Sequence, residues 1–383
     1  MDRRDFMKTV GMAGGLATMA SGLGAGVAAA AGPEGGAGGT AARQAMLGLL
    51  DTIRGVQEKL IRADRGFSPE ELAGAERSLA HILYTALDFW LEANPSRPVF
   101  RPYVTPTRKL LGCNPDSVYY FAPIRDDKRY RISGNVGAAT FTSFTIEQGS
   151  EEGHAARGSS ASISDLEMEI NGDGSYEIIV SRDKPSSGNW LELKPGASQI
   201  TTRHYHEAKQ NVAAIPGRVI PINLEVLDPE PHAPYGGADE VAKHLQWVAN
   251  FVREHAAMTF QKTTPEMAEK LGWVSLEKNT FPKPGQWASA AGDNAYGNTH
   301  AWYCSSRYDL KPDVALVITG RFPACRFANV VLWNSFMQSY DYANRQISLN
   351  RNQVTYEDDG SFRLVIAHED PGVPNWLDTE GRQ

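Results

Sequence analysis

Residues 166–180 decide the fold class, and they read Leu166-Glu167-Met168-Glu169-Ile170, Asn171-Gly172-Asp173-Gly174, Ser175 and Tyr176-Glu177-Ile178-Ile179-Val180. Two runs of strand-forming residues flank a four-residue segment of Asn, Asp and Gly. Tight turns favour these three residues because their backbone enters the left-handed region at low cost. The stretch therefore predicts a β-hairpin.

The same two-residue period extends on both sides of this hairpin. Arg129-Tyr130-Arg131-Ile132-Ser133 alternates in polarity, as a half-solvated strand does. Further strands are expected near residues 138–147, 199–206, 218–227, 314–319, 329–333 and 362–366. No helical pattern separates neighbouring strands, which favours antiparallel sheets.

Helical periodicity is confined largely to residues 41–93 and 238–272. Ser68-Pro69-Glu70-Glu71 has the pattern of a capping box with proline at the first helical position. The fold class predicted from these patterns is mainly β: an antiparallel, jelly-roll-like β-sandwich with a helical N-terminal layer and a helical insertion.

The N-terminus has the pattern of an export signal. Arg3-Arg4 precedes Phe6 and Lys8, an uncharged run follows, and Ala28-Ala29-Ala30-Ala31 suits a cleavage site. Paired arginines in this position indicate the twin-arginine route. We therefore expect a periplasmic or secreted protein that engages the twin-arginine machinery and keeps no stable membrane anchor after cleavage.

Six segments follow from these patterns. They are a signal peptide (1–31), a flexible leader (32–40), a helical N-terminal region (41–99), a first β region (100–237), a helical insertion (238–272) and a C-terminal β region (273–383).

Composition excludes several classes of protein. The 383 residues carry a net charge of −7, which argues against nucleic acid as a partner because phosphate contacts need a basic surface. The three cysteines, Cys113, Cys304 and Cys325, exclude a disulfide-rich scaffold and a four-cysteine zinc site. We expect buried thiols, or one disulfide and one thiol left over.

Four short stretches resemble signature segments of the bacterial family catalogued as domain of unknown function 1214. These stretches are Asn114-Pro115-Asp116-Ser117-Val118-Tyr119-Tyr120, Asn189-Trp190-Leu191, Ser348-Leu349-Asn350 and Pro371-Gly372-Val373-Pro374-Asn375-Trp376-Leu377-Asp378-Thr379. The last is the most specific, and the resemblance covers roughly residues 100–383. It implies a jelly-roll-like fold, often beside a sister domain numbered 1254, and no particular reaction.

The sequence departs from the family pattern at its end. The family chain continues after the Asn-Trp-Leu-Asp motif into another strand, whereas this sequence ends at Gln383. Either the sequence is truncated or this member lacks that strand, which would leave an unpaired sheet edge.

Two carboxylates are candidates for general acid and base, Asp116 and Asp378. Tyr119, Tyr120, Arg203, Tyr205 and Trp376 are candidate ligand-binding residues; the resemblance favours Arg203 and Tyr205 as signature positions. Arg203 would hold an oxyanion or a carboxylate. In the alternative interpretation, the Asn and Asp side chains cap turns and Trp376 fills the sandwich core.

His204 and His206 are the best metal candidates, because residues two apart on a strand point to the same side. A third ligand would be needed, for which His154, Glu207 and His300 are candidates. The alternative is two histidines on a solvated strand face. No metal site is predicted, and the sequence indicates no cofactor.

Three functions fit these observations. The first is an exported protein that binds, with or without transforming, a small, largely apolar organic molecule in a β-sandwich pocket. The second is a carbohydrate- or cell-wall-acting jelly-roll module. The third is a structural envelope protein without catalysis that assembles through sheet edges. Whether the protein is an enzyme stays open.

Overall fold

The computed structural model describes residues 37–231, 236–286 and 296–382. The expected signal peptide and the first five residues of the expected leader lie outside this range. Helix α2 (Ala37–Leu60) begins inside the last four positions of that leader.

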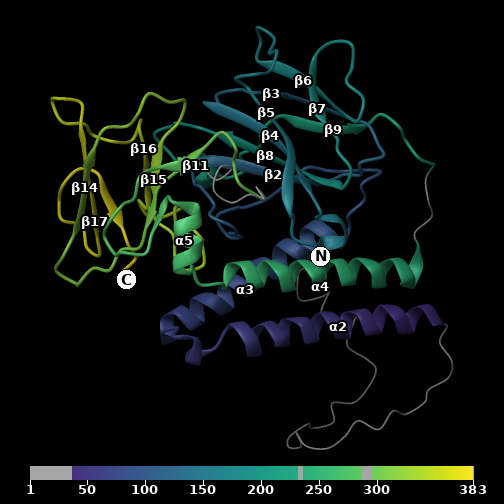
Figure 1. The fold of residues 1–383 in the computed structure, drawn as a ribbon, viewed down its shortest axis with the longest axis horizontal. Coiled ribbons are helices and arrows are strands. Elements are labelled where there is room, and N and C mark those ends of the chain that lie inside the picture. Colours follow the sequence, from purple (N-terminus) through teal and green to yellow (C-terminus); the bar gives the residue numbers. More distant parts are fainter. Residues whose placement is uncertain (1–36, 232–235, 287–295, 383) are drawn as a thin grey trace, which may run out of the picture. The chain divides into compact units, whose positions relative to one another are not determined.

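In the described residues, three long helices and one short one accompany the sheets. They are α2, α3 (Pro69–Trp90), α4 (Gly237–Thr259) and α5 (Pro265–Leu271), with single 3-10 turns η1 (Ala63–Arg65), η2 (Glu151–Gly153) and η3 (Val212–Ala214). The expected capping box is present: Ser68 Oγ accepts from the Glu71 N–H, and the Glu71 carboxylate accepts from the Ser68 N–H. Figure 1 shows α2 running alongside α4. None of the described helices combines the length and apolarity needed to cross a membrane.

The main sheet has five antiparallel strands. In spatial order these are β1 (Arg101–Pro102), β2 (Ser117–Pro123), β8 (Ala197–Tyr205), β4 (Phe141–Gln148) and β5 (Gly158–Ser164). One face carries Phe144, Ile146 and Ile200, which pack into a core shared with a second sheet. The other face is polar, and Phe121 at its end stacks on Phe89 of α3 with ring centroids 4.1 Å apart.

The second sheet has four strands, β7 (Asn189–Glu192), β6 (Ser175–Ser181), β3 (Tyr130–Asn135) and β9 (Ile222–Val226). Tyr176 contributes to the shared core, and its ring lies 5.6 Å from that of Phe144. The β6–β7 pair is parallel, as are β17–β18 and β10–β13, so the expectation of purely antiparallel sheets is corrected.

Four smaller sheets complete the described chain. They are β14 (Leu316–Gly320) with β17 (Phe362–Ala367) and β18 (Trp376–Asp378), β15 (Asn329–Val331) with β16 (Ser348–Asn350), β10 (Val274–Ser275) with β13 (Ser305–Ser306), and β11 (Gly285–Gln286) with β12 (Trp302–Tyr303). The protein is therefore mainly β.

Strand pairings repeat along the chain at a constant separation, which we call the repeat offset. Ile132 pairs with Ile178 between β3 and β6, and Ile318 pairs with Leu364 between β14 and β17. The step from position 132 to position 318 equals the step from position 178 to position 364. The same offset relates β4–β5 to β15–β16, through the pairs Phe144–Ile163 and Val330–Leu349. We name residues 130–193 the first copy and residues 316–379 the second copy.

Side-chain hydrogen bonds repeat with the strands. In the first copy, Asn189 Nδ2 donates to the Glu169 and Glu177 carbonyls at 2.8 and 2.9 Å, and Asn189 Oδ1 accepts from the Glu169 N–H at 2.7 Å. Asn375 makes the same three bonds in the second copy, to Thr355 and Arg363. The fold therefore contains an internal duplication, which the sequence patterns above did not reveal.

We call the three hydrogen bonds of Asn189, and the matching three of Asn375, the asparagine clamp. The clamp at Asn189 explains why the first strand of the predicted hairpin does not form. Residues 175–181 form β6, but residues 166–170 form no strand. The Asn189 amide bonds the backbone of Glu169 and that of Glu177, so a side chain fills the place of the expected partner strand.

Trp376 also lies differently from the expectation. Successive residues of a strand face opposite sides, and Leu377 is the residue buried in the second copy's core. Trp376 is half-buried and donates its indole N–H to the Ala367 carbonyl at 3.1 Å. Trp190 repeats this bond with the Ser181 carbonyl, also at 3.1 Å.

We predict that Asn375→Ala lowers the free energy of unfolding by about 2 to 4 kcal/mol, because it removes three hydrogen bonds to backbone groups. Asn189→Ala should cost a similar amount, since both copies use the same clamp. Urea unfolding measures both, with the exposed turn variant Asn171→Ala as control. A loss at Asn375 no larger than the control's would contradict the clamp.

Candidate functional site

The polar face of the five-stranded sheet gathers the strongest candidates. Arg203 on β8 lies opposite Tyr119 on β2 and opposite Ser143 on β4. Because side chains alternate along a strand, all three project from the face away from the shared core. Tyr205, two residues along β8, projects from this face as well, and its ring lies 6.2 Å from that of Tyr119.

Arg203 is buried and bonded to neutral oxygens. One guanidinium nitrogen donates to Thr145 Oγ1 at 3.1 Å, and the other donates to the carbonyls of Tyr296 and Gly297 at 2.7 and 3.3 Å. Only 4% of the residue is exposed. Among the residues that the structure describes, no carboxylate lies within ion-pair distance of it. Buried charges are normally paired, so a buried guanidinium that forms no ion pair within the described residues is unusual.

Glu147, on the same face of β4, is fully buried. Its Oε2 accepts from the Ser159 hydroxyl at 2.8 Å and from the Tyr296 N–H at 3.3 Å. Its Oε1 has no hydrogen-bond partner within the described ranges. Burial raises the pKa of this carboxyl to about 7, and the positive charge of Arg203 opposes part of the rise.

Tyrosine side chains lie around Arg203 and Glu147. Burial raises the pKa of Tyr103 and Tyr119 well above the usual value and that of Tyr303 to about 12, so all three phenols stay protonated at neutral pH. Tyr303 Oη accepts from the Asn298 N–H at 3.3 Å, and Tyr296 Oη accepts from the Ala156 N–H at 2.8 Å. Phenol hydroxyls and ring edges thus line the polar face.

Several other buried polar atoms in the described part of the chain lack hydrogen-bond partners, and two of them belong to residues that contact this site or its neighbours. These are Ser143 Oγ, beside Arg203, and Nε2 of His255 on α4. The His255 ring stacks on Phe251 at 3.6 Å and lies 5.5 Å from the ring of Tyr296. Unsatisfied buried polar atoms are rare in native structures and often mark a place where water or a ligand binds.

Asp116 lies elsewhere, in a network of amides. Its Oδ1 accepts from Asn211 at 2.7 Å and from Asn350 at 3.0 Å, and its Oδ2 accepts from Asn329 at 2.8 Å. Burial raises the pKa of this carboxyl, while the three amide bonds oppose the rise. Asn329 and Asn350 belong to the second copy, so Asp116 joins that copy to the start of β2.

Asp378 has different partners. It pairs with Arg345 at 2.7 Å and accepts from the Glu380 N–H at 2.7 Å. Within the described residues, Asp116 and Asp378 share no partner, so the structure does not assemble them as an acid and base pair.

Tyr120, His204 and His206 are separated from the Arg203 site. Tyr120 and His204 lie on the face of the sheet that enters the shared core. Burial lowers the pKa of His204 to about 3 and that of His206 to about 4. The His204 ring bonds the hydroxyls of Thr202 and Thr142 at 3.0 and 3.4 Å.

The three candidates for a third metal ligand have other partners. His154 bonds Glu254 at 2.7 Å, Glu207 pairs with Arg351 at 2.6 Å, and His300 bonds Ser162 at 3.0 Å. In the part of the chain that the structure covers, no three His, Cys, Asp or Glu side chains cluster as a metal site. Cys113 is buried as a free thiol, whereas Cys304 and Cys325 are exposed free thiols, which corrects the expectation of buried ones.

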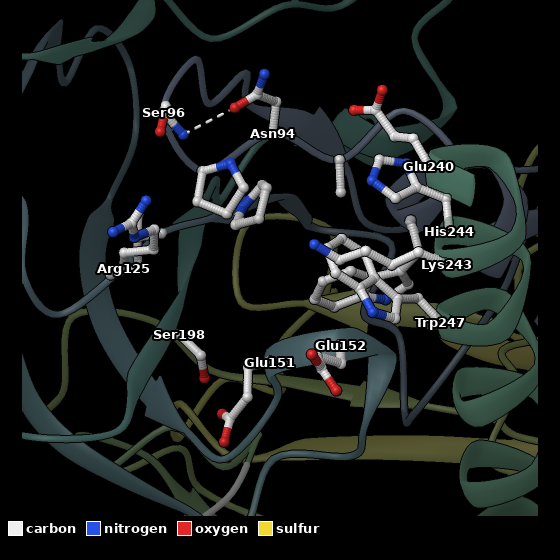
Figure 2. Close-up of a pocket in the computed structure, with 15 residues that line it drawn as sticks. Asn94, Ser96, Arg125, Glu151, Glu152, Ser198, Glu240, Lys243, His244 and Trp247 are labelled. Carbon is white, nitrogen blue, oxygen red and sulfur yellow. Dashed lines mark hydrogen bonds between the residues drawn. The ribbon is translucent and has the colours of Figure 1, made fainter. Parts of the chain in front are cut away.

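A separate pocket of about 310 Å³ lies beside α4 (Figure 2). Glu240, Lys243, His244 and Trp247 of the helix line one side, and Arg125 lies across from them. The Trp247 indole already stacks on the His244 ring at 4.6 Å and lies 4.7 Å from Lys243 Nζ. The pocket therefore offers no open aromatic platform and holds neither Asp116, Arg203 nor Asp378.

Comparisons with known proteins agree with the fold and assign no activity. The family described as "Protein of unknown function (DUF1214)" matches residues 122–209 and 306–383, the two segments that contain the two copies. This match supports the family resemblance over these two regions.

No curated protein matches the chain. A crystal structure of an uncharacterised protein from Burkholderia cenocepacia is 26% identical, with a TM-score of 0.75 over 89% of this chain and 92% of that chain. A Vibrio parahaemolyticus protein is 12% identical, with a TM-score of 0.42 over 79% and 90% of the two chains.

Of the residues on this face, Arg203, Tyr119 and Tyr205 were named as candidates from the sequence, and Glu147, Tyr296 and Tyr303 were not. The available signal for Glu147 was a carboxylate that continues the polar alternation of Ser143 and Thr145 along one strand. Tyr296 and Tyr303 approach the sheet from a distant segment, which no local pattern indicates.

We predict that Glu147→Gln removes a pH dependence of stability. Folding raises the carboxyl pKa from 4.5 to about 7, so the folded state holds the proton more tightly and wild-type stability falls as pH rises across that window. The variant should gain up to about 3 kcal/mol over wild type at pH 8 and nothing at pH 4. Urea unfolding across pH measures this difference. Parallel profiles for the two proteins would show that Glu147 is not buried as described.

Proposed function

We propose that the protein binds a small, largely apolar organic molecule carrying one acidic group, with the acid held by Arg203. The observation that carries the proposal is a buried guanidinium whose acceptors, within the described residues, are all neutral. Removing a charge from water costs several kcal/mol unless a counter-ion compensates it. A ligand carboxylate is the natural partner, because arginine binds carboxylates through two parallel hydrogen bonds.

The tyrosines account for the rest of such a ligand. Their rings supply apolar walls, and their protonated hydroxyls supply donors that fix orientation. Glu147 limits the choice of ligand, since its ionised form would repel an acid. Binding should therefore be tighter below pH 7, where the Glu147 carboxyl is mostly neutral.

This proposal changes the expected position of the ligand, which from the sequence alone was a pocket of the β-sandwich. The space between the two sheets of the first copy is filled by apolar side chains, including Tyr130, Ile132 and Ile178. We place the ligand on the outer, polar face of the five-stranded sheet instead of between the sheets.

The binding proposal is tested by thermal shift and calorimetry with small aromatic and aliphatic monocarboxylates, each beside its methyl ester. Wild type should bind at least one acid and discriminate against the ester by about 10-fold or more. Arg203→Met should lose this discrimination because it removes the charge, and Arg203→Lys should keep part of it. Acids and esters that bind wild type equally would contradict the proposal.

We also propose that the protein is exported by the twin-arginine route and acts in the periplasm or outside the cell. The support is the Arg3-Arg4 pair followed by small residues up to Ala31. The intact mass of the periplasmic protein should correspond to cleavage near Ala31, and Arg3→Lys with Arg4→Lys should leave the precursor in the cytoplasm. A periplasmic protein that retains residues 1–31 would contradict cleavage.

A further inference from the structure

A serine and a histidine meet on the edge of the same polar face. Ser162 Oγ on β5 lies 3.0 Å from His300 Nε2, the distance of a hydrogen bond between a nucleophile and its base. Thr299 Oγ1 donates to Ser162 Oγ at 3.3 Å, so the serine hydroxyl has its own donor and can direct its proton to the imidazole. Both residues are half-buried and therefore reachable from solvent.

Ser162 is close to the ligand site proposed above. It pairs across the strands with Thr145, and Thr145 Oγ1 accepts the hydrogen bond from Arg203. Residues paired on neighbouring antiparallel strands have Cβ atoms about 5 Å apart. The serine hydroxyl and the guanidinium thus lie on one face, with a single threonine between them.

An acidic group lies near the histidine. Asp165, three residues after Ser162, is almost fully buried, and its Oδ1 has no hydrogen-bond partner within the described ranges. Burial raises the pKa of the Asp165 carboxyl, and the Arg326 and His300 side chains oppose that rise. Asp165 Oδ2 pairs with Arg326 at 3.1 Å, so Arg326 offsets part of the stabilisation that this carboxylate gives to a protonated imidazole.

The internal duplication shows that this pair is not a general requirement of the fold. Ser348, one repeat offset after Ser162, accepts from the amide of Asn211 at 3.0 Å. Asn114, one repeat offset before His300, bonds the amide of Asn329. The residues that correspond to Ser162 and His300 thus each bond a side-chain amide, and amides do not act as acids or bases near neutral pH.

The two copies also differ in how many of their buried polar side-chain atoms lack a hydrogen-bond partner. In the described residues, side-chain atoms without hydrogen-bond partners occur in the first copy, among them atoms of Ser143, Glu147, Ser160 and Asp165, and none occur in the second copy. The second copy is internally satisfied, whereas the first copy presents unsatisfied groups around the serine and histidine.

We propose that Ser162 is a nucleophile activated by His300, and that the protein hydrolyses esters of small apolar acids. Ser162 Oγ bonds to the ester carbonyl carbon while its proton passes to His300 Nε2. The carbon–alkoxide bond then breaks, and His300 returns the proton to the departing alcohol. Water, deprotonated by His300, releases the acid from the acyl-serine and restores the serine proton. This chemistry requires the His300 tautomer with its proton on Nδ1.

The hydrolysis proposal rests on the proposed binding function in one respect: the acid that hydrolysis releases is the kind of ligand that Arg203 would bind. It is tested separately with an alkyl fluorophosphonate, which reacts covalently with activated serines and carries no carboxylate for Arg203. Failure of this labelling would therefore overturn the Ser162–His300 proposal and leave carboxylate binding at Arg203 as a separate question.

The experiment treats the purified mature protein with the fluorophosphonate and follows the adduct by intact mass and peptide mapping. One adduct is expected, on Ser162, and Ser162→Ala should abolish it. His300→Asn and His300→Gln, checked for unchanged melting temperature, should slow labelling by about 100-fold or more, as loss of a general base does. Ser348→Ala, at the corresponding position of the second copy, should label like wild type.

A second measurement follows hydrolysis of p-nitrophenyl butyrate. Both Ser162→Ala and His300→Asn should lose this activity. No adduct on folded wild type, an adduct on another serine, or folded His300 variants that label at the wild-type rate would each overturn the proposal.

Discussion

A buried guanidinium that has no carboxylate partner in the described part of the chain is the constraint around which the polar face is built. Arg203 donates to the Tyr296 and Gly297 carbonyls, and these bonds hold a distant segment against the five-stranded sheet. That segment brings the Tyr303 phenol and, through the Tyr296 N–H, a donor for Glu147. One desolvated charge thus organises the groups that would contact a ligand, and it favours a ligand of opposite charge.

The two copies of the internal duplication contain matching strand pairs, and their polar side chains have different roles. In the second copy, Asn329 and Asn350 hold the Asp116 carboxylate, so polar side chains there fasten one part of the chain to another. In the first copy, the corresponding positions are Ser143 and Ser164, whose side chains are shorter. Ser164 Oγ donates to Glu167 at 3.0 Å, whereas Ser143 Oγ has no hydrogen-bond partner within the described residues. Because the second copy provides the fastening, the first is free to carry a site.

Local patterns in the sequence predicted local structure well. Alternation located β4, β8 and β9, and the Ser68 capping box marked the start of α3. Alternation does not reveal that Ser143, Thr145 and Glu147, on the outer face of β4, are buried. The segment that begins at Tyr296 approaches this face from far along the chain, and its Tyr296 N–H donates to Glu147.

Side-chain contacts also explain two departures from what the sequence predicted. The expected hairpin fails because the Asn189 side chain replaces a strand, and Asp116 and Asp378 have separate partners. The signal for the duplication was nevertheless present, since Asn-Trp-Leu and the preceding Asp-Gly-Ser both recur at the repeat offset, as Asn375-Trp376-Leu377 and Asp359-Gly360-Ser361.

The central claim is that Arg203 needs an anion, and native mass spectrometry of protein purified gently from the cells that make it tests this claim most directly. The account predicts a fraction of wild type with one added small acid, released on acidification, and folded Arg203→Met without it. An acid retained equally by both proteins, or wild type that carries none and takes up none from a mixture of monocarboxylates, would contradict the account.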